Sequence, residues 1–362
     1  MKENRTKKIL ESMKAQNVAQ LVISDPASIY YLTGRWILPG ERLLVLLLNG
    51  DGCHKLFINE LFPVDEDLGA EKIILKDTQD GVQILSDHIR KEGTVGIDKN
   101  WPSRFLIRLM ELRTQTRFIN GSPIVDLIRQ IKDEDEIRKM RAASLINDAA
   151  VKELALLLRH EYTEKEMGAK LSEIYQKLGT TEGFSFEPII GYGKNAADPH
   201  HMNSDDKPKK GDSVILDIGC VKDGYCSDMT RTVFYGEPSA KAREVYNIVL
   251  EAQLRGIAAV KPGATFADVD HACRDYITEK GYGQYFTHRT GHNIGIECHE
   301  YGDVSSVNTA VLKPGMIFSI EPGIYIPGEV GVRIEDLVVV TETGCENLNH
   351  CTKDLCIVAI DV

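Results

Sequence analysis

Apolar runs alternate with amphipathic stretches along the first third of the chain. Three runs have the continuous apolar character of buried strands: Gln20–Ser24, Leu43–Leu48 and Lys72–Leu75. Two other stretches repeat apolar residues with helical spacing: Val82–Arg90 and Arg104–Leu112. Such alternation is typical of an α/β domain. We therefore predict an N-terminal α/β domain over residues 1–125 and a second domain over residues 126–362.

The pattern changes in the second part of the chain. The acidic segment Lys132–Glu136 suits the start of a long helix, and Thr163–Glu166 fits a capping box for the next one. After residue 183, glycine and proline become frequent and apolar runs are short and β-branched. Strands are predicted at Ser213–Asp217, Arg231–Tyr235, Met316–Ile320 and Glu335–Thr341, and helices at Ala240–Val260 and Phe266–Lys280. This mixture predicts an α+β domain, with an antiparallel sheet that carries helices.

Composition narrows the class of protein. The chain has 362 residues, 43% of them hydrophobic, which suits a globular protein of two domains. Its net charge of -11 repels phosphate backbones, so nucleic acid is not an expected partner. The longest apolar run, Leu43–Leu48, is far too short to span a membrane. Eight scattered cysteines without a Cys-x-x-Cys pair, and an N-terminus without the apolar core of a signal peptide, predict a cytoplasmic location.

Acidic residues stand where the predicted strands should be apolar. Asp217 ends one strand, and Asp228 follows the turn Asp223-Gly224. A two-residue hairpin there pairs Asp217 with Thr230 and puts Asp228 diagonally on the same face. Two buried carboxylates on one face must share a proton or a cation.

Glu321 and Glu335 repeat this arrangement, because a turn around Pro327-Gly328 brings them opposite each other. Any one of these acids alone reads better as a solvated residue at a strand end. As a set, two acid-bearing hairpins with a histidine form a ligand set for two hard divalent ions. Carboxylates with one imidazole favour Mn²⁺, with Co²⁺ or Zn²⁺ as alternatives.

The histidines are the other candidates. Five of the ten lie in glycine- and proline-rich segments of the acid-rich domain: His200, His201, His288, His292 and His299. A lone histidine is usually a surface or packed residue, but this clustering favours function. From the residues alone, the imidazole ligand is His288, His292 or His299.

The motifs resemble those of the pita-bread metallopeptidases, the superfamily of methionine aminopeptidase, aminopeptidase P, prolidase and creatinase. The resemblance covers essentially the whole chain and rests on these segments: Asn195–His200, Leu216–Gly219, Ser227–Thr232, Thr290–Gly295, Glu297–Glu300, Ser319–Tyr325 and Gly331–Asp336. It implies a C-terminal pita-bread catalytic domain, like that of creatinase and methionine aminopeptidase, after an N-terminal α/β creatinase-like domain. Asn293 departs from the usual glycine beside His292.

The resemblance also implies roles. The metal ligands would be Asp217, Asp228, His292, Glu321 and Glu335. Glu321 would also be the general base that takes the proton from a metal-bridging water, which leaves the attacking hydroxide. The substrate and the tetrahedral intermediate would be held by His200, His288 and His299. Arg333 would position the proline end of the substrate or the acid cluster.

The activity implied is hydrolysis of the Xaa-Pro bond, in Xaa-Pro dipeptides, by a homodimer. The alternative enzyme is an Xaa-Pro aminopeptidase that acts on longer peptides. Two further alternatives are a creatinase-like hydrolase without metal and a catalytically inactive binding module of the same fold. The chain keeps all the ligand positions, which disfavours the creatinase-like hydrolase. Metal analysis of the purified protein would distinguish the enzyme from the inactive binding module.

Overall fold

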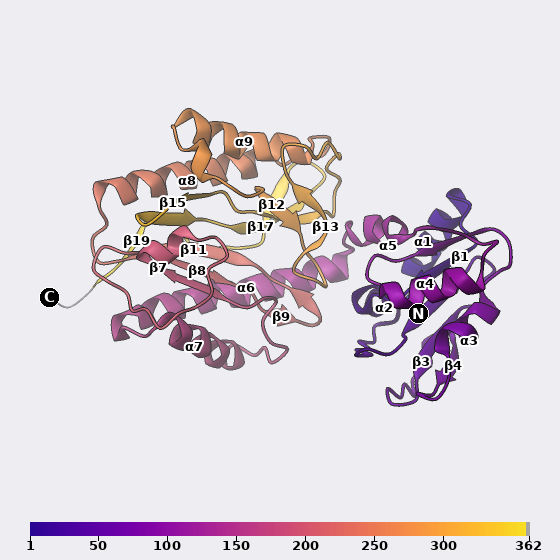
Figure 1. The fold of residues 1–362 in the computed structure, drawn as a ribbon. Coiled ribbons are helices and arrows are strands. Elements are labelled where there is room, and N and C mark those ends of the chain that lie inside the picture. Colours follow the sequence, from indigo (N-terminus) through magenta and orange to yellow (C-terminus); the bar gives the residue numbers. More distant parts are fainter. Residues whose placement is uncertain (360–362) are drawn as a thin grey trace. The chain divides into compact units, whose positions relative to one another are not determined.

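The computed structural model describes residues 1–359 and divides the chain into two compact units, Met1–Arg129 and the part that begins at Gln130 (Figure 1). The division follows helix α5 (Ser122–Arg129), which packs against α1 (Glu3–Ala15) and so belongs to the first unit. It therefore lies a few residues beyond the boundary placed at 125/126 from the sequence.

The first unit is built on a six-stranded mixed sheet in the order β4-β3-β2-β1-β5-β6. Its strands are β1 (Gln20–Ile23), β2 (Val45–Asn49), β3 (Lys55–Asn59), β4 (Glu71–Leu75), β5 (Thr94–Ile97) and β6 (Arg117–Asn120). β2 runs antiparallel to both of its neighbours, and the other pairs are parallel. The predicted strands at 20, 43 and 72 are confirmed, whereas β3, β5 and β6 were not predicted.

Two groups of helices accompany this sheet. Helices α3 (Gly81–His88) and α4 (Ser103–Leu112) close one core, in which Leu85 and Leu109 pack with strand residues such as Val22 and Phe57. Helix α2 (Pro26–Thr33) packs with α1 and begins at Asp25, whose carboxylate accepts a hydrogen bond from Ser28 N. Asp25 is thus a conventional N-cap.

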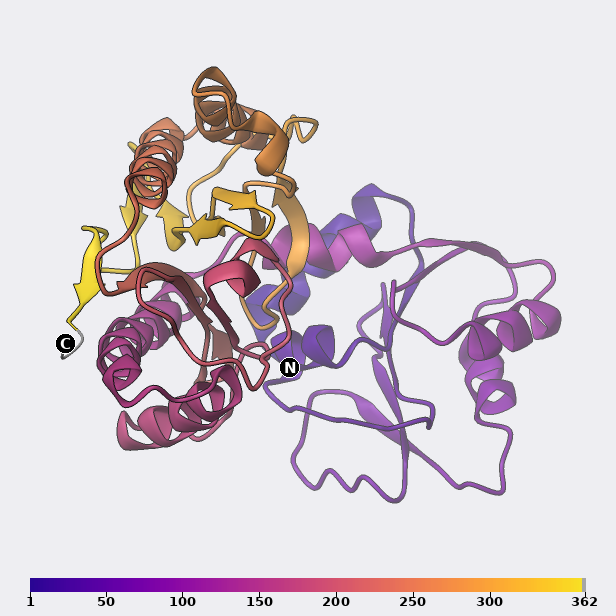
Figure 2. The ribbon, with the colours of Figure 1, turned by 60° about the vertical axis from the view of Figure 1, so that its left-hand side comes forward.

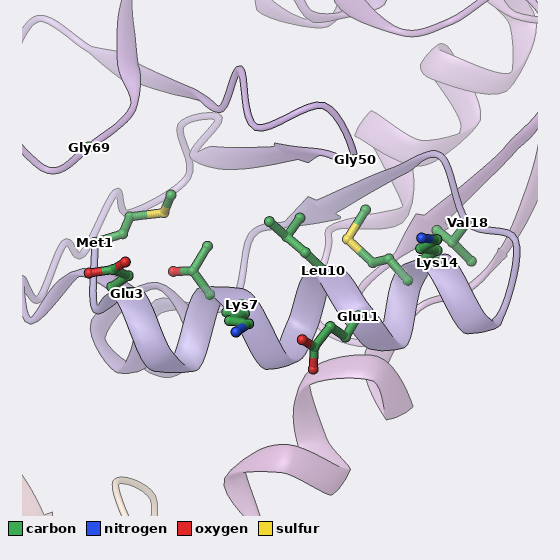
Figure 3. Close-up of a pocket in the computed structure, with 11 residues that line it drawn as sticks. Met1, Glu3, Lys7, Leu10, Glu11, Lys14, Val18, Gly50 and Gly69 are labelled. Carbon is green, nitrogen blue, oxygen red and sulfur yellow. The ribbon is translucent and has the colours of Figure 1, made fainter.

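A groove of about 750 Å³ runs along α1 (Figure 3). Its lining mixes acidic Glu3 and Glu11 and basic Lys7 and Lys14 with apolar side chains. Charges of both signs, separated along one helix, form no ligand cluster. The groups of potential metal ligands found in residues 1–359 lie in the second unit.

The second unit contains two larger sheets and two short hairpins. One sheet has the order β19-β11-β8-β7 and the other β13-β12-β14-β17-β18, with β9-β10 and β15-β16 as separate pairs. The strands of the first sheet are β7 (Ile189–Tyr192), β8 (Ser213–Ile218), β11 (Met229–Tyr235) and β19 (Cys356–Val358). Those of the second are β12 (Gly291–Asn293), β13 (Glu300–Val304), β14 (Ile317–Ile320), β17 (Asp336–Val340) and β18 (Cys345–Asn347). The short pairs are β9 (Val221–Lys222) with β10 (Tyr225–Cys226), and β15 (Gly323–Ile326) with β16 (Val330–Arg333).

Each large sheet has its own pair of helices. Helices α6 (Glu134–Leu157) and α7 (Glu164–Lys177) pack on the first sheet, and α8 (Ala240–Ala259) and α9 (Phe266–Glu279) pack on the second. Figure 2 shows the two helix pairs on opposite sides of the strands. The predicted capping box at Thr163 starts α7. Helix α6 begins in the acidic segment, as predicted, and Asp133 forms a capping box there that was not predicted. Short 3₁₀ turns follow at η1 (Leu158–His160), η2 (Gly193–Ala197) and η3 (Gly283–Tyr285).

The predicted registers of both acid-bearing hairpins are confirmed. Asp217 pairs with Thr230, and Asp223 and Gly224 both have the positive φ that a tight two-residue turn requires. In the second hairpin Ile326 pairs with Val330 and Ile320 pairs with Asp336, which sets Glu321 opposite Glu335. The pairing therefore places Asp217 in β8, and places Glu321 and Glu335 at the adjoining ends of β14 and β17.

Candidate active site

A cavity of about 570 Å³ in the second unit is lined by all the residues that the sequence predicts for the site. They come from the two hairpins, from β12 and its flanking loops, and from the loop between η2 and β8. The predicted residues are His200, Asp217, Asp228, His288, His292, His299, Glu321, Arg333 and Glu335. The structure therefore brings the predicted set into one place, although the residues span more than 130 positions of the sequence.

The two hairpins are joined through Thr230. Its hydroxyl donates to Glu335 Oε2 at 2.7 Å, and its carbonyl accepts from Glu335 N at 3.1 Å. Asp217, Asp228 and Glu335 are all buried, and the Glu321 side chain is 16% exposed. Four carboxylates are thus held in a region that excludes most water.

Burial changes the proton affinity of these acids. Desolvation raises the pKa of Asp217 to about 6, although the Arg333 guanidinium opposes the change. Desolvation likewise raises the pKa of Glu321 to about 7, against the opposing charges of His292 and Arg333. Desolvation and the neighbouring carboxylates raise the pKa of Glu335 well above its usual range. Without a cation, the cluster therefore retains protons near neutral pH.

Several carboxylate oxygens in the cluster have no hydrogen-bond partner. Buried Asp217 Oδ1, Asp228 Oδ1 and Glu335 Oε1 are all unpaired among the described residues. An unpaired buried oxygen costs free energy unless it meets a donor or a cation. Oxygen-rich ligands with one imidazole suit divalent ions, so these residues fit bound metal.

His292 is oriented as a ligand. Its Nδ1 lies 3.2 Å from Asn293 O, so the proton sits on Nδ1 and Nε2 is the free nitrogen. Nε2 is 3.5 Å from both Asp228 Oδ2 and Glu321 Oε1. Potential ligand atoms of Asp228, His292 and Glu335 all lie within 4.8 Å of one another. These three residues could therefore bind one metal ion together.

Arg333 connects the acids to a second network. Its guanidinium donates to Asp217 Oδ2 at 2.7 Å, to Thr230 Oγ1 at 3.1 Å and to Tyr325 Oη at 2.7 Å. Tyr325 Oη in turn lies 2.8 Å from His288 Nε2, and His288 Nδ1 lies 2.6 Å from Arg289 O. Both nitrogens of His288 are therefore engaged by the protein. Desolvation lowers the pKa of His288 to about 3, which keeps it neutral.

The loop that carries His200 is anchored by a buried acid, Glu164. Its Oε1 accepts from Tyr192 N and Asn195 Nδ2, each at 2.9 Å, and its Oε2 lies 2.7 Å from His201 Nε2. His201, one of the histidines clustered in the sequence, thus holds the loop. His200 itself is exposed at the cavity.

His299 and Arg289 line the cavity without such commitments. The His299 ring packs against His292 in a tilted arrangement with centroids 4.1 Å apart, and desolvation lowers the pKa of His299 to about 4. Among residues 1–359 neither its ring nitrogens nor the guanidinium of exposed Arg289 has a hydrogen-bond partner. Both groups are therefore available to a ligand.

With this geometry in place, the chain can be set beside known proteins. The model described as Metallopeptidase family M24 matches residues 138–342, and the Creatinase/Prolidase N-terminal domain matches residues 5–131. The chain belongs to metallopeptidase family M24. An uncharacterized peptidase of Staphylococcus aureus strain MRSA252 is 38% identical over 356 residues, which cover 96% of this M24 chain and 99% of that protein.

Solved structures resemble this M24 peptidase over nearly its full length. A prolidase from Thermococcus sibiricus has a TM-score of 0.94 at 33% identity and covers 98% of both chains. An Xaa-Pro dipeptidase from Bacillus anthracis has a TM-score of 0.88 at 33% identity, covering 98% and 99%. An X-Pro aminopeptidase from Thermotoga maritima has a TM-score of 0.82 at 32% identity, covering 96% and 100%.

These matches confirm the predicted family and fold class, a metallopeptidase catalytic domain after a creatinase-like N-terminal domain. The M24 chain is therefore a hydrolase that uses divalent metal. No helix in residues 1–359 is long and apolar enough to cross a membrane.

Sequence reasoning did not select three residues of the M24 site. Tyr325 follows Glu321 at strand spacing on the same face, a signal that was present in the pattern. Arg289 and Cys298 lie in loops, where no periodicity says which way a side chain points. Only the fold places them on the cavity.

We expect the metal-free M24 peptidase to lose stability as pH rises through about 7, the raised pKa of Glu321. Because the pKa values of Glu321 and Glu335 are raised, the folded state still binds protons at pH values where the unfolded chain has already released them. Unfolding is therefore favoured as those protons leave. Below about pH 6.5 the lowered pKa values of His288 and His299 act in the opposite sense.

Thermal unfolding with and without Mn²⁺ measures this effect. The rise in Tm on adding Mn²⁺ should be larger at about pH 8.5 than at about pH 7, because the cation replaces the protons. A metal-induced rise that is equal at both values would contradict the shared-proton account of the apo cluster.

Proposed function

We propose that this M24 peptidase hydrolyses the Xaa-Pro bond of dipeptides with the help of two divalent ions, most simply Mn²⁺. The observation that carries the proposal is one cavity that combines an acid–imidazole cluster with an unpartnered guanidinium. The first suits metal-assisted hydrolysis, and the second suits a substrate that ends in a free carboxylate. Likeness to the Thermococcus sibiricus prolidase supports the same substrate class.

The metal ligands in this proposal are Asp217, Asp228, His292, Glu321 and Glu335. When bound, two divalent ions would lower the pKa of an attacking water and polarise the scissile carbonyl. The unpaired oxygens of Asp217, Asp228 and Glu335 are the atoms left to meet them. Carboxylate ligands favour manganese over softer ions.

Glu321 is the group that moves the proton. Its Oε1 accepts from Ser319 Oγ at 3.1 Å, which fixes the carboxylate toward the cluster. Burial raises the pKa of Glu321 to about 7 in the metal-free site, and nearby cations would lower it, which leaves the carboxylate ionised and able to accept a proton. Glu321 takes the proton from the attacking water and returns it to the proline nitrogen as the peptide bond breaks.

His200, His288 and His299 line the same cavity, and we assign them to the substrate side. The uncommitted ring of His299 can donate a hydrogen bond to the developing oxyanion. His288 contacts a substrate through Nε2 only if it gives up Tyr325 Oη. Arg333 is already committed to Asp217, Thr230 and Tyr325, so we assign it to positioning Asp217.

Arg289 is then the residue that binds the free carboxylate of a dipeptide. Its guanidinium is exposed on the cavity and presents planar paired donors that suit a carboxylate. A charge-assisted contact is roughly twice as strong as a neutral hydrogen bond, and it is lost when the carboxylate becomes an amide. This contact would favour dipeptides over longer peptides.

We expect Ala-Pro to have a higher kcat/KM than Ala-Pro-amide and Ala-Pro-Ala. Arg289→Gln should reduce that preference by about tenfold, mainly by raising KM for Ala-Pro, since a hydrogen bond to a charged group is worth about 1.5–3 kcal/mol. Arg255→Gln is the matched control, because Arg255 lies on α8 and pairs with Glu251 there. A higher kcat/KM for the tripeptide would overturn the dipeptidase proposal.

The main alternative is an Xaa-Pro aminopeptidase, because this chain also resembles the X-Pro aminopeptidase from Thermotoga maritima. The same kinetic panel distinguishes the two. An inactive binding module is disfavoured by the complete acid cluster, and inactivity of metal-loaded protein on every Xaa-Pro substrate would favour it. The proposal also includes a cytoplasmic location and a homodimer. Light scattering would test the dimer.

A further inference from the structure

A cysteine thiol lies beside the proposed metal ligands but is not one of them. Cys298 is buried in the segment between β12 and β13 and lines the same cavity as the acids. Its Sγ donates to Asp228 Oδ2 at 3.4 Å. A thiol is a poor partner for hard ions but a strong ligand for softer ones.

Two imidazoles complete a ligand set around this thiol. Potential ligand atoms of His292, Cys298 and His299 all lie within 4.8 Å of one another. Ligands of a tetrahedral zinc ion lie about 3.5 Å apart, given Zn–N and Zn–S bonds of about 2.0–2.3 Å. Small side-chain adjustments would therefore place all three on one ion. His299 is free to join, because its ring nitrogens have no partner among residues 1–359.

This set competes with the acidic one. His292 also belongs to the group formed with Asp228 and Glu335. Only its Nε2 is available, since Nδ1 is held by Asn293 O. One nitrogen serves one ion, so the two sets cannot both use His292. Hard ions prefer the carboxylates, whereas ions with affinity for sulfur prefer the thiolate.

We propose that His292, Cys298 and His299 form a second metal site, which binds thiophilic divalent ions of the zinc and cadmium class and draws His292 away from the acidic set. On binding, the Cys298 S–H bond breaks, its proton passes to solvent and a sulfur–metal bond forms. The site makes the peptidase sensitive to soft metals. That consequence rests on the proposed function, whereas the binding itself does not.

Cadmium titration of the Mn²⁺-loaded protein tests the site by ultraviolet absorption, because a cadmium–thiolate bond has its own charge-transfer band. Exposed Cys53 and Cys356 are first replaced by serine to remove background. The parent protein should develop a band that saturates at one ion per chain. Cys298→Ala should remove it. Cys226→Ala is the matched control, since Cys226 is also buried and its Sγ donates to Ile296 O at 3.4 Å.

Inhibition of Ala-Pro hydrolysis is the second readout. Losing even an outer partner of a metal ligand weakens affinity by about 10–100-fold, so Cys298→Ala should need at least about tenfold more Cd²⁺ for half inhibition. If Cys298→Ala is unstable, Cys298→Ser replaces it, because serine keeps a donor toward Asp228 without a thiolate.

A band that persists in both Cys298 variants would overturn the proposal, and so would equal cadmium inhibition in parent and variant. If the protein hydrolyses no Xaa-Pro substrate, the proposed function fails while the absorption band still decides the metal site.

Discussion

Replacing Glu321 by glutamine is expected to lower kcat by at least about 10²–10⁴-fold, the range for loss of a general base. Glutamine keeps the size of the side chain but cannot hold the proton, and it is also a weaker metal ligand. Glu321 lies within 3.5 Å of His292 Nε2, so its carboxylate acts where the cluster is densest. The loss should be in kcat rather than in KM, because substrate contacts elsewhere remain.

Glu329→Gln is the matched control, since Glu329 is exposed at the tip of the same hairpin. It should retain full activity. Circular dichroism and Tm should show that Glu321→Gln remains folded, because a neutral side chain relieves repulsion among buried acids. A Glu321→Gln variant that kept a tenth of the parent kcat would remove Glu321 from the proposed role.

Removing metal is expected to lower activity by about 10³-fold or more, since a bound cation supplies several kcal/mol of transition-state stabilisation. The acids would then refill with protons, as the raised pKa values of Asp217 and Glu321 indicate. Activity should return when Mn²⁺ is added after the chelator has been dialysed away.

Metal content should be measured on the same samples by elemental analysis. Recovery should saturate at about two ions per chain, as expected for a two-metal site. Protein that is free of metal by elemental analysis but fully active would contradict the assignment of the acid cluster.

The acid positions could be predicted because strand pairing is periodic. The Asp223-Gly224 turn fixes which residue faces Asp217, and the same logic places Glu321 opposite Glu335. An acid at the end of an apolar strand is visible in sequence because burial makes it costly. These features are local, so one chain without its structure is enough to find them.

Partners fixed by tertiary packing could not be predicted. The sequence left Arg333 to position the proline end of the substrate or the acid cluster, and did not show that it pairs with Asp217. Nor did it show that Asp336 pairs with Arg231. Which acid an arginine meets depends on how two sheets meet, and no residue spacing encodes that. For the same reason, the engagement of both His288 nitrogens became visible only in the folded chain.

The central claim is metal-dependent cleavage before proline, and hydrolysis of Ala-Pro against Ala-Ala by the Mn²⁺-loaded protein tests it most directly. Released amino acids are quantified for both dipeptides with protein, Mn²⁺ and substrate concentrations held equal. The account predicts rapid release of proline from Ala-Pro, little hydrolysis of Ala-Ala, and neither reaction in chelated protein. Faster hydrolysis of Ala-Ala than of Ala-Pro, or no hydrolysis of Ala-Pro by fully loaded protein, would contradict it.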